Sequence, residues 1–128
     1  MSNHALIIED NPYNAEVLAS LLAAENVSST IVIDLSTIGD ELGHLPQISI
    51  IFLDLEMPDA TGYEVFEYLM SDPRASAVPI VAYTVHISEI NVARKLGFHS
   101  FLGKPLNSNR FADQLHRILN NQAVWEVG

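Results

Sequence analysis

The sequence predicts an α/β fold in which a parallel β-sheet is covered by helices on both faces. Five short runs of Ile, Val, Leu and Phe lie along the chain, and each is followed by a segment whose apolar residues recur at helical spacing. Consecutive apolar residues suit strands that are buried on both faces, as in parallel sheets. Because crossovers between parallel strands are right-handed, five such units form a (βα)5 doubly wound sheet.

The predicted strands are short and rich in β-branched residues, and the first predicted helix follows directly on the first strand. Asn11 is placed to accept a hydrogen bond as an N-cap, and Pro12 suits the first helical position. The strands are expected at residues 5–8, 30–33, 48–53, 79–83 and 100–102, and the stripe of the first helix is Ala15, Leu18, Leu21 and Leu22.

Four further helices are predicted from the same spacing and from their end signals. Pro46 is expected to stop the second helix, Thr61 and Glu64 form a capping-box pattern at the start of the third, and Pro73 ends it. Gly97 suits the C-terminal cap of the fourth helix. The apolar stripes are Ile38, Leu42 and Leu45; Val65, Phe66 and Leu69; Ile90, Ala93 and Leu96; and Phe111, Leu115, Ile118 and Leu119.

Composition excludes several classes of function. The 128 residues include 16 acidic and 6 basic ones, so the formal charge is −10 and binding to nucleic acid or to an anionic membrane surface is not expected. The absence of cysteine excludes disulfides, thiolate zinc sites and a Cys nucleophile. No basic leader and no apolar run of membrane-spanning length are present, which favours a soluble, cytoplasmic protein.

Polar residues follow four of the five predicted strands. Glu9 and Asp10 follow the first strand, Asp54 ends the third, Thr84 follows the fourth and Lys104 follows the fifth. Ligands of open parallel sheets bind outside the carboxyl ends of the strands. We therefore expect these side chains to lie together at one edge of the sheet, where clustered carboxylates favour a hard divalent cation.

The chain resembles the receiver domain of bacterial two-component response regulators, of the stand-alone, chemotaxis-receiver type. The resemblance rests on four segments in the family's order and spacing, namely residues 7–11, 52–58 with Gly62, 79–84 and 102–105. It implies a flavodoxin-like sheet in the strand order 2-1-3-4-5. It also implies one receiver domain over residues 1–128, with a core of about 4–121, a short tail at 122–128 and no output domain.

The resemblance further implies the chemistry of the site. Asp54 would accept a phosphoryl group from a sensor histidine kinase or a histidine phosphotransfer protein. Asp10 and Asp54 would bind Mg²⁺ directly, with Mn²⁺ as a substitute, while Glu9 acts through water and Glu56 offers its backbone carbonyl. The domain would then catalyse its own phosphotransfer and dephosphorylation, although it is better described as a signalling switch than as a metabolic enzyme.

Other positions are assigned roles by the same resemblance. Thr84 and Lys104 would bind the phosphoryl group, and the Lys104–Pro105 peptide bond is expected to be cis. Thr84 would act as the switch together with Phe101, whose alternative is an ordinary core role in a buried strand. Val85, Glu56 and His86 are expected to tune access to the site and the lifetime of the phosphoryl group.

The expected partners are the phosphodonor and a downstream protein. The downstream protein would dock on the face formed by the fourth helix, the fifth strand and the last helix, and a homodimer through this face is compatible with the family. Trp125, beyond the last helix, would either fold back onto apolar surface or anchor a partner.

Three other functions compete with the switch. One is a receiver-like interaction module that is never phosphorylated. Another is an aspartyl-phosphate phosphatase of the haloacid dehalogenase type, but that family places its nucleophile after the first strand, whereas Asp54 follows the third. The last is an FMN carrier, which needs a phosphate-binding loop where this chain has the acidic residues Glu9 and Asp10.

Overall fold

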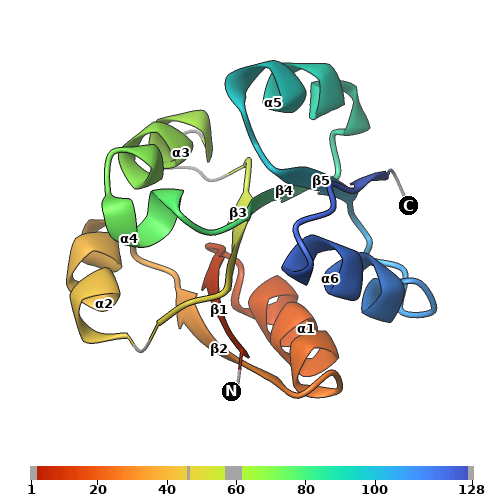
Figure 1. The fold of residues 1–128 in the computed structure, drawn as a ribbon, viewed down its shortest axis with the longest axis horizontal. Coiled ribbons are helices and arrows are strands. Elements are labelled where there is room, and N and C mark those ends of the chain that lie inside the picture. The colour runs from red at the N-terminus through yellow and green to blue at the C-terminus, as the bar shows by residue number, and fades with distance from the viewer. Residues whose placement is uncertain (1–2, 46, 57–61, 127–128) are drawn as a thin grey trace.

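A parallel sheet of six strands forms the centre of the computed structural model, which describes residues 3–45, 47–56 and 62–126 (Figure 1). The strand order β2-β1-β3-β4-β5-β6 confirms the predicted flavodoxin-like order for the first five strands. The strands are β1 (Asn3–Ile8), β2 (Val27–Val32), β3 (Ile50–Asp54), β4 (Ile80–Thr84), β5 (Ser100–Gly103) and β6 (Trp125–Glu126).

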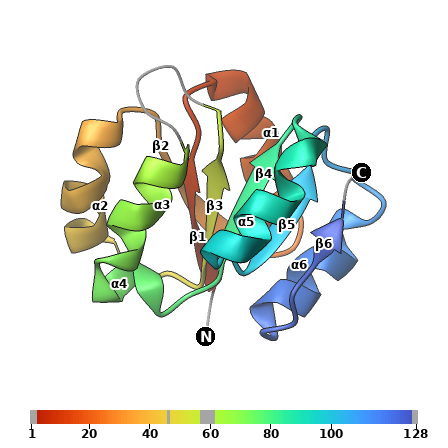
Figure 2. The same cartoon turned by 90° about the horizontal axis from the view of Figure 1, so that it is seen from above.

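Helices cover both faces of this sheet, as the alternating pattern predicts. Helices α1 and α6 pack on one face and α2 to α5 on the other (Figures 1 and 2). None of the helices in the described part of the chain is long and apolar enough to cross a membrane. The helices are α1 (Pro12–Ala23), α2 (Ile38–His44), α3 (Gly62–Met70), α4 (Pro73–Ser76), α5 (Ile90–Leu96) and α6 (Phe111–Leu119), with 3-10 turns at Leu35–Thr37 and Ile87–Glu89.

The strands at the centre of the sheet are buried because helices lie over both of their faces. Every residue of β3, β4 and β5 is buried, and so are the last four residues of β1. Alternate side chains enter two separate apolar clusters, one on each side of the sheet. This arrangement explains why the strands are apolar at nearly every position and show no alternation with polar residues.

Several predicted boundaries differ from the structure. Strand β2 begins at Val27, three residues before the prediction, and Pro73 begins the short helix α4, which was not predicted. Asp72 caps α4 by accepting a hydrogen bond from the backbone of Arg74, so the Asp-Pro pair both separates and starts helices. Gly97 adopts the left-handed conformation expected of a C-terminal cap. Three predicted features lie outside the described residues: Pro46, the Met57–Pro58 part of the segment 52–58, and the Thr61 cap.

A sixth strand forms at Trp125–Glu126, within the segment 122–128 that the sequence predicts to be a tail. Strand β6 pairs in parallel with β5, and the Phe101 backbone N–H donates to the Val124 carbonyl at 2.8 Å. Trp125 folds back onto the apolar cluster on the α5 side, where the Arg94 guanidinium lies 4.7 Å from its ring. Two paired residues are too few to show a strand pattern in the sequence.

A salt-bridge cluster holds β6 against α6. The Glu126 carboxylate accepts from Gln114 Nε2 at 2.8 Å and from the Arg117 guanidinium at 3.0 Å, and it also pairs with Arg110. These donors lower the pKa of Glu126, the Gln114 hydrogen bond most of all. The edge of β5 is therefore covered by the chain itself, which protects an otherwise open sheet edge.

Replacing Trp125 with Ala is expected to lower the free energy of unfolding by about 1–3 kcal/mol, because packing on the core and the contact with Arg94 are both lost. Urea unfolding followed by far-UV circular dichroism measures this change. Leu96→Ala is the matched control, since Leu96 is 51% exposed on the same face and its loss should cost about 0.5 kcal/mol or less. Equal effects of the two substitutions would show that the Trp125 side chain adds no more stability than an exposed residue does.

Candidate functional site

Four neighbouring strands end at one edge of the sheet and place polar side chains there. Glu9 follows β1, Asp54 ends β3, Thr84 ends β4 and Lys104 follows β5. These strands are consecutive neighbours, and Figure 2 shows β3, β4 and β5 side by side. With Asp10, these side chains line a hollow of about 250 Å³. The residues that the sequence places after separate strands are thus brought together.

Three carboxylates crowd this hollow. Each of Glu9, Asp10 and Asp54 offers an oxygen atom within 4.8 Å of the others. Glu9 is 1% exposed and Asp54 is 3% exposed, so water screens their repulsion poorly. Burial, and then the hydrogen bond and the charge of Asp54, raise the pKa of Glu9 to about 7, although Lys104 acts in the opposite direction.

The donor set of the hollow fits a hard divalent cation. Glu9 Oε1 is buried and finds no hydrogen-bond donor among the described residues, which is costly for a carboxylate oxygen. Mg²⁺ prefers an all-oxygen site with one or two carboxylates and several waters, and Mn²⁺ accepts the same ligands. The carboxylates of Glu9, Asp10 and Asp54 are therefore the residues that could hold such an ion.

The backbone around Asp54 is fixed by two local features. Asp54 Oδ1 accepts a hydrogen bond from the Glu56 backbone N–H at 3.0 Å. Helix α3 begins so close to this strand that a Cβ atom on Gly62 would lie 2.8 Å from the Asp54 carbonyl oxygen and 2.5 Å from the Leu55 Cα. Glycine at position 62 therefore allows the helix to pack directly against the backbone that carries Asp54.

Lys104 is the cation of the hollow. Its Nζ atom lies 3.4 Å from Glu9 Oε2 and 3.4 Å from Asp54 Oδ2, and its side chain is only 14% exposed. The Lys104 backbone N–H donates to the Thr84 carbonyl at 2.8 Å, and the Lys104–Pro105 peptide bond is cis. Lys104 is thus anchored by its backbone to β4 while its ammonium group faces the carboxylates.

Tyr83 is a site residue that sequence reasoning missed. Its hydroxyl donates to Glu9 Oε2 at 3.3 Å, and its ring lies 4.4 Å from Lys104 Nζ. Burial, followed by the charge of Glu9, raises the pKa of this hydroxyl far above its ordinary value, so it acts as a donor. The sequence contains one signal that could have identified it: Tyr83 is a polar aromatic residue at the end of an aliphatic strand, directly before Thr84.

Thr84, Val85, His86 and Glu56 border the opening of the hollow. Thr84 is buried, and its Oγ1 accepts a hydrogen bond from the His86 backbone N–H at 3.1 Å. Val85 is 58% exposed and lines the hollow from the side of β4. The His86 imidazole pairs with the Glu56 carboxylate, which joins the loop after β4 to the loop after β3 across the opening.

Phe101 lies apart from the carboxylates. Its side chain is fully buried in the apolar cluster on the α5 side of the sheet, and its register partner in β6 is Trp125. This burial fits the core role predicted for Phe101, and its switch role stays a prediction.

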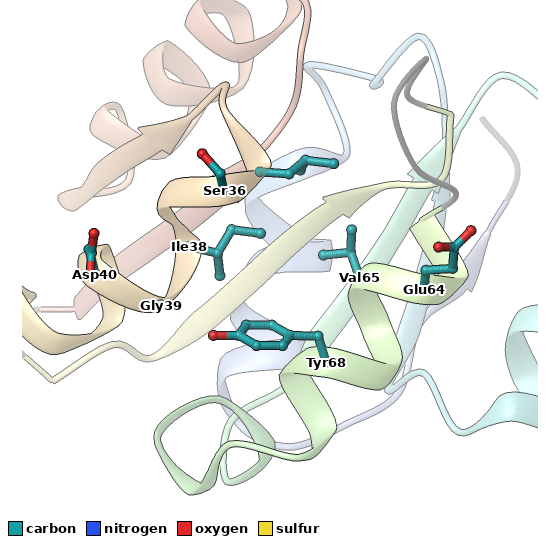
Figure 3. A pocket seen from close by; sticks show the side chains of 8 residues that line it. Ser36, Ile38, Gly39, Asp40, Glu64, Val65 and Tyr68 are labelled. Carbon is teal, nitrogen blue, oxygen red and sulfur yellow. The ribbon is translucent and has the colours of Figure 1, made fainter.

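A second hollow, of about 420 Å³, lies between the 3-10 turn before α2 and helix α3 (Figure 3). Ile38, Val65 and Tyr68 form its apolar lining, and the Tyr68 phenol crosses it toward Gly39. The acidic residues at its rim, Asp40 and Glu64, are both exposed. Because none of its lining side chains is a buried titratable group, the reactive chemistry belongs to the carboxylate hollow.

Comparison with known proteins decides the family. The family model of the response regulator receiver domain matches residues 5–116. The chain belongs to the response regulator receiver domain family. Its fold agrees with solved structures: a sensor protein from Polaromonas superposes with a TM-score of 0.81 at 25% identity, over 93% of this chain and 97% of that one.

Other relatives of this receiver come from bacteria, fungi and plants. The cell cycle response regulator CtrA of Brucella ovis is 32% identical over 89% of this chain and 49% of its own length. Stress response regulator protein 1 of Candida tropicalis is 30% identical over 80% of this chain and 40% of its length. The rice two-component response regulator ORR11 is 26% identical over 91% and 80%. The receiver thus spans less than half of the first two proteins.

One solved relative contains a metal ion. The receiver domain of the Pseudomonas aeruginosa sensor histidine kinase PA1611 was solved with a magnesium ion coordinated in its active site cleft. It superposes with a TM-score of 0.78 at 22% identity, covering 94% of this chain and 99% of that one, so the likeness by itself shows the fold.

The raised pKa of Glu9 predicts a pH dependence of stability in metal-free buffer. Between about pH 4.5 and 7 the folded state retains a proton that the unfolded state has lost, so the free energy of unfolding falls as the pH rises through this window. The shift corresponds to roughly 3 kcal/mol. Chemical unfolding in EDTA across this range measures it, and Glu9→Gln is expected to remove this part of the slope. An identical slope in Glu9→Gln would show that Glu9 titrates normally.

Proposed function

We propose that this receiver is a phosphorylation-operated switch of a two-component pathway, in which Asp54 accepts a phosphoryl group from a phosphohistidine. The observation that carries the proposal is the buried Asp54 carboxylate, which lies beside the carboxylates of Glu9 and Asp10 and 3.4 Å from the Lys104 ammonium. A hydrolytic phosphatase or an FMN carrier would need different residues after β1. The rival that shares this fold is a module that is never phosphorylated.

In the transfer step, a carboxylate oxygen of Asp54 attacks the phosphorus atom of the phosphohistidine. The new P–O bond forms as the P–N bond breaks, and the imidazole nitrogen leaves with the electron pair of that bond. The Glu56 backbone N–H holds Asp54 Oδ1, which leaves Oδ2 facing Lys104 as the freer oxygen. In hydrolysis, a water oxygen attacks the phosphorus atom and a proton of that water passes to solvent. The P–O bond to Asp54 breaks, inorganic phosphate leaves, and the Asp54 carboxylate is regenerated.

Charge neutralisation is the main demand of phosphoryl transfer. A Mg²⁺ ion bound by Asp10, Asp54, water on Glu9 and the Glu56 carbonyl would supply Lewis-acid stabilisation of the phosphoryl oxygens. The Lys104 ammonium, which lies 3.4 Å from Asp54 Oδ2 and 3.4 Å from Glu9 Oε2, adds a second positive charge. The Thr84 hydroxyl, which now accepts from the His86 backbone, can instead donate to a phosphoryl oxygen.

Signalling follows from this exchange of hydrogen bonds. When Thr84 turns toward the phosphoryl group, the loop that carries Val85 and His86 moves with it, and the pair between His86 and Glu56 must adjust. Phe101, in the neighbouring strand, is the proposed partner of Thr84 in the switch. The downstream protein would bind the α5–β5–α6 face, where exposed Ile87, Val92 and Leu96 are available but β6 already covers the edge of β5.

Incubation with Mg²⁺ and acetyl phosphate tests the proposal. The intact mass is expected to rise by one phosphoryl group, the peptide that carries it should contain Asp54, and Asp54→Ala should abolish the gain. Asp113→Asn removes the same charge from an exposed site on α6 and is the matched control. Mapping the phosphoryl group to another residue, or finding the full gain in Asp54→Ala, would overturn the assignment, and no gain at all would favour the unphosphorylated module.

The Val85 side chain is expected to slow phosphoryl exchange by narrowing the opening of the hollow. Val85→Ala should therefore increase the rates of phosphorylation by acetyl phosphate and of dephosphorylation, each by several-fold. Val92→Ala is the control, because Val92 is exposed to a similar extent on α5 and does not line the hollow. Unchanged rates in Val85→Ala would show that this side chain does not limit access.

A further inference from the structure

Tyr83 occupies an unusual place for a core residue. It is 1% exposed in β4, directly opposite Asp54 in the β3–β4 register, and its ring packs edge-on against Phe52 in the apolar cluster on the α1 side. The other end of the side chain extends beyond that cluster and contacts Glu9 and Lys104 of the carboxylate hollow. One side chain thus joins the hydrophobic core to the carboxylate site.

The first contact is made by the hydroxyl group. It donates to Glu9 Oε2 at 3.3 Å, so Glu9 has one oxygen held by protein donors while Oε1 has none among the described residues. A hydrogen bond to one carboxylate oxygen fixes the rotation of the whole group. The free oxygen is then turned in a constant direction, as outer donors do for metal-ligating side chains.

The second contact is made by the ring. Lys104 Nζ lies 3.4 Å from each of its two carboxylate partners, which is longer than the 2.7–2.9 Å typical of charged N–H···O hydrogen bonds. The carboxylates therefore attract the ammonium group without fixing its direction. The Tyr83 ring lies 4.4 Å from the same nitrogen, within the range of a cation–π contact, and the site is largely desolvated.

We propose that Tyr83 is a positioning residue for the reaction, in which its hydroxyl orients Glu9 toward the metal position and its ring holds the Lys104 ammonium beside Asp54. The inference rests on the proposed function for its consequence in phosphoryl transfer. Its two contacts are properties of the metal-free protein and can be tested without any phosphodonor. The two parts of the side chain can be removed separately.

The ring contact has a spectroscopic signature. The chain has two lysines, Lys104 in the hollow and Lys95 exposed on α5, so a sample labelled in lysine gives one ε-methylene signal for each. The Lys104 signal is expected upfield of the Lys95 signal in metal-free protein, because of the aromatic ring current. Tyr83→Phe should preserve this difference, and Tyr83→Leu should remove most of it.

The hydroxyl contact is read by calorimetric titration with Mg²⁺. Tyr83→Phe is expected to weaken Mg²⁺ binding by about tenfold, the lower end of what loss of an outer hydrogen bond costs a metal site. Once Mg²⁺ is saturating, Tyr83→Phe should be phosphorylated by acetyl phosphate at nearly the wild-type rate, whereas Tyr83→Leu should be slower by about tenfold. Phe52→Leu removes a neighbouring core ring and should change neither the Lys104 signal nor the Mg²⁺ affinity.

The outcomes separate this inference from the proposed function. Coincident Lys104 and Lys95 signals in the wild type, or an upfield Lys104 signal retained in Tyr83→Leu, would overturn the role of the ring. Equal Mg²⁺ affinities of wild type and Tyr83→Phe would overturn the role of the hydroxyl. If Tyr83→Leu fails to fold, the wild-type signal and the Tyr83→Phe titration still decide. Failure of Asp54 to be phosphorylated would contradict the proposed function and leave these readouts unchanged.

Discussion

Crowding of carboxylates at the carboxyl edge of the sheet is the constraint on which the rest of this site depends. Glu9, Asp10 and Asp54 offer oxygen atoms within 4.8 Å of one another, and the first and last of these residues are almost fully buried. Lys104 offsets part of this negative charge. Burial, and then the hydrogen bond and charge of Asp54, raise the pKa of Glu9. A divalent cation or a proton on Glu9 would relieve the repulsion that remains.

The fold tolerates the repulsion among these carboxylates because the backbone that carries them is held in place by the core. Strands β1, β3, β4 and β5 are buried between two apolar clusters, and Gly62 lets helix α3 approach the backbone of Asp54 closely. A strand of this kind cannot move its terminal carboxylate away from its neighbours without disturbing the core. Because the core is closely packed, a structural change at Asp54 can displace few neighbouring segments, chiefly the loop that follows Thr84.

The C-terminal residues change how the receiver presents its surface. The face expected to receive a downstream protein contains β6, with Trp125 on the core and Glu126 held by donors of α6. A partner on this face meets the chain's own strand where other sheets would offer the open edge of β5. Exposed apolar side chains of α5 lie beside β6. A partner on this face would therefore contact helix side chains and would not pair with β5.

The sequence by itself determined the first five strands, the helices other than α4, the family, and the set Glu9, Asp10, Asp54, Thr84 and Lys104, because strand ends and helix caps are local signals and parallel strands share one edge. Only the tertiary structure decided the places of β6, Phe101 and Tyr83. Two-residue pairing has no sequence period, and Phe101 is buried through contacts with distant segments. Tyr83 reads as one more core residue of β4 until the fold brings Glu9 and Lys104 to its far end.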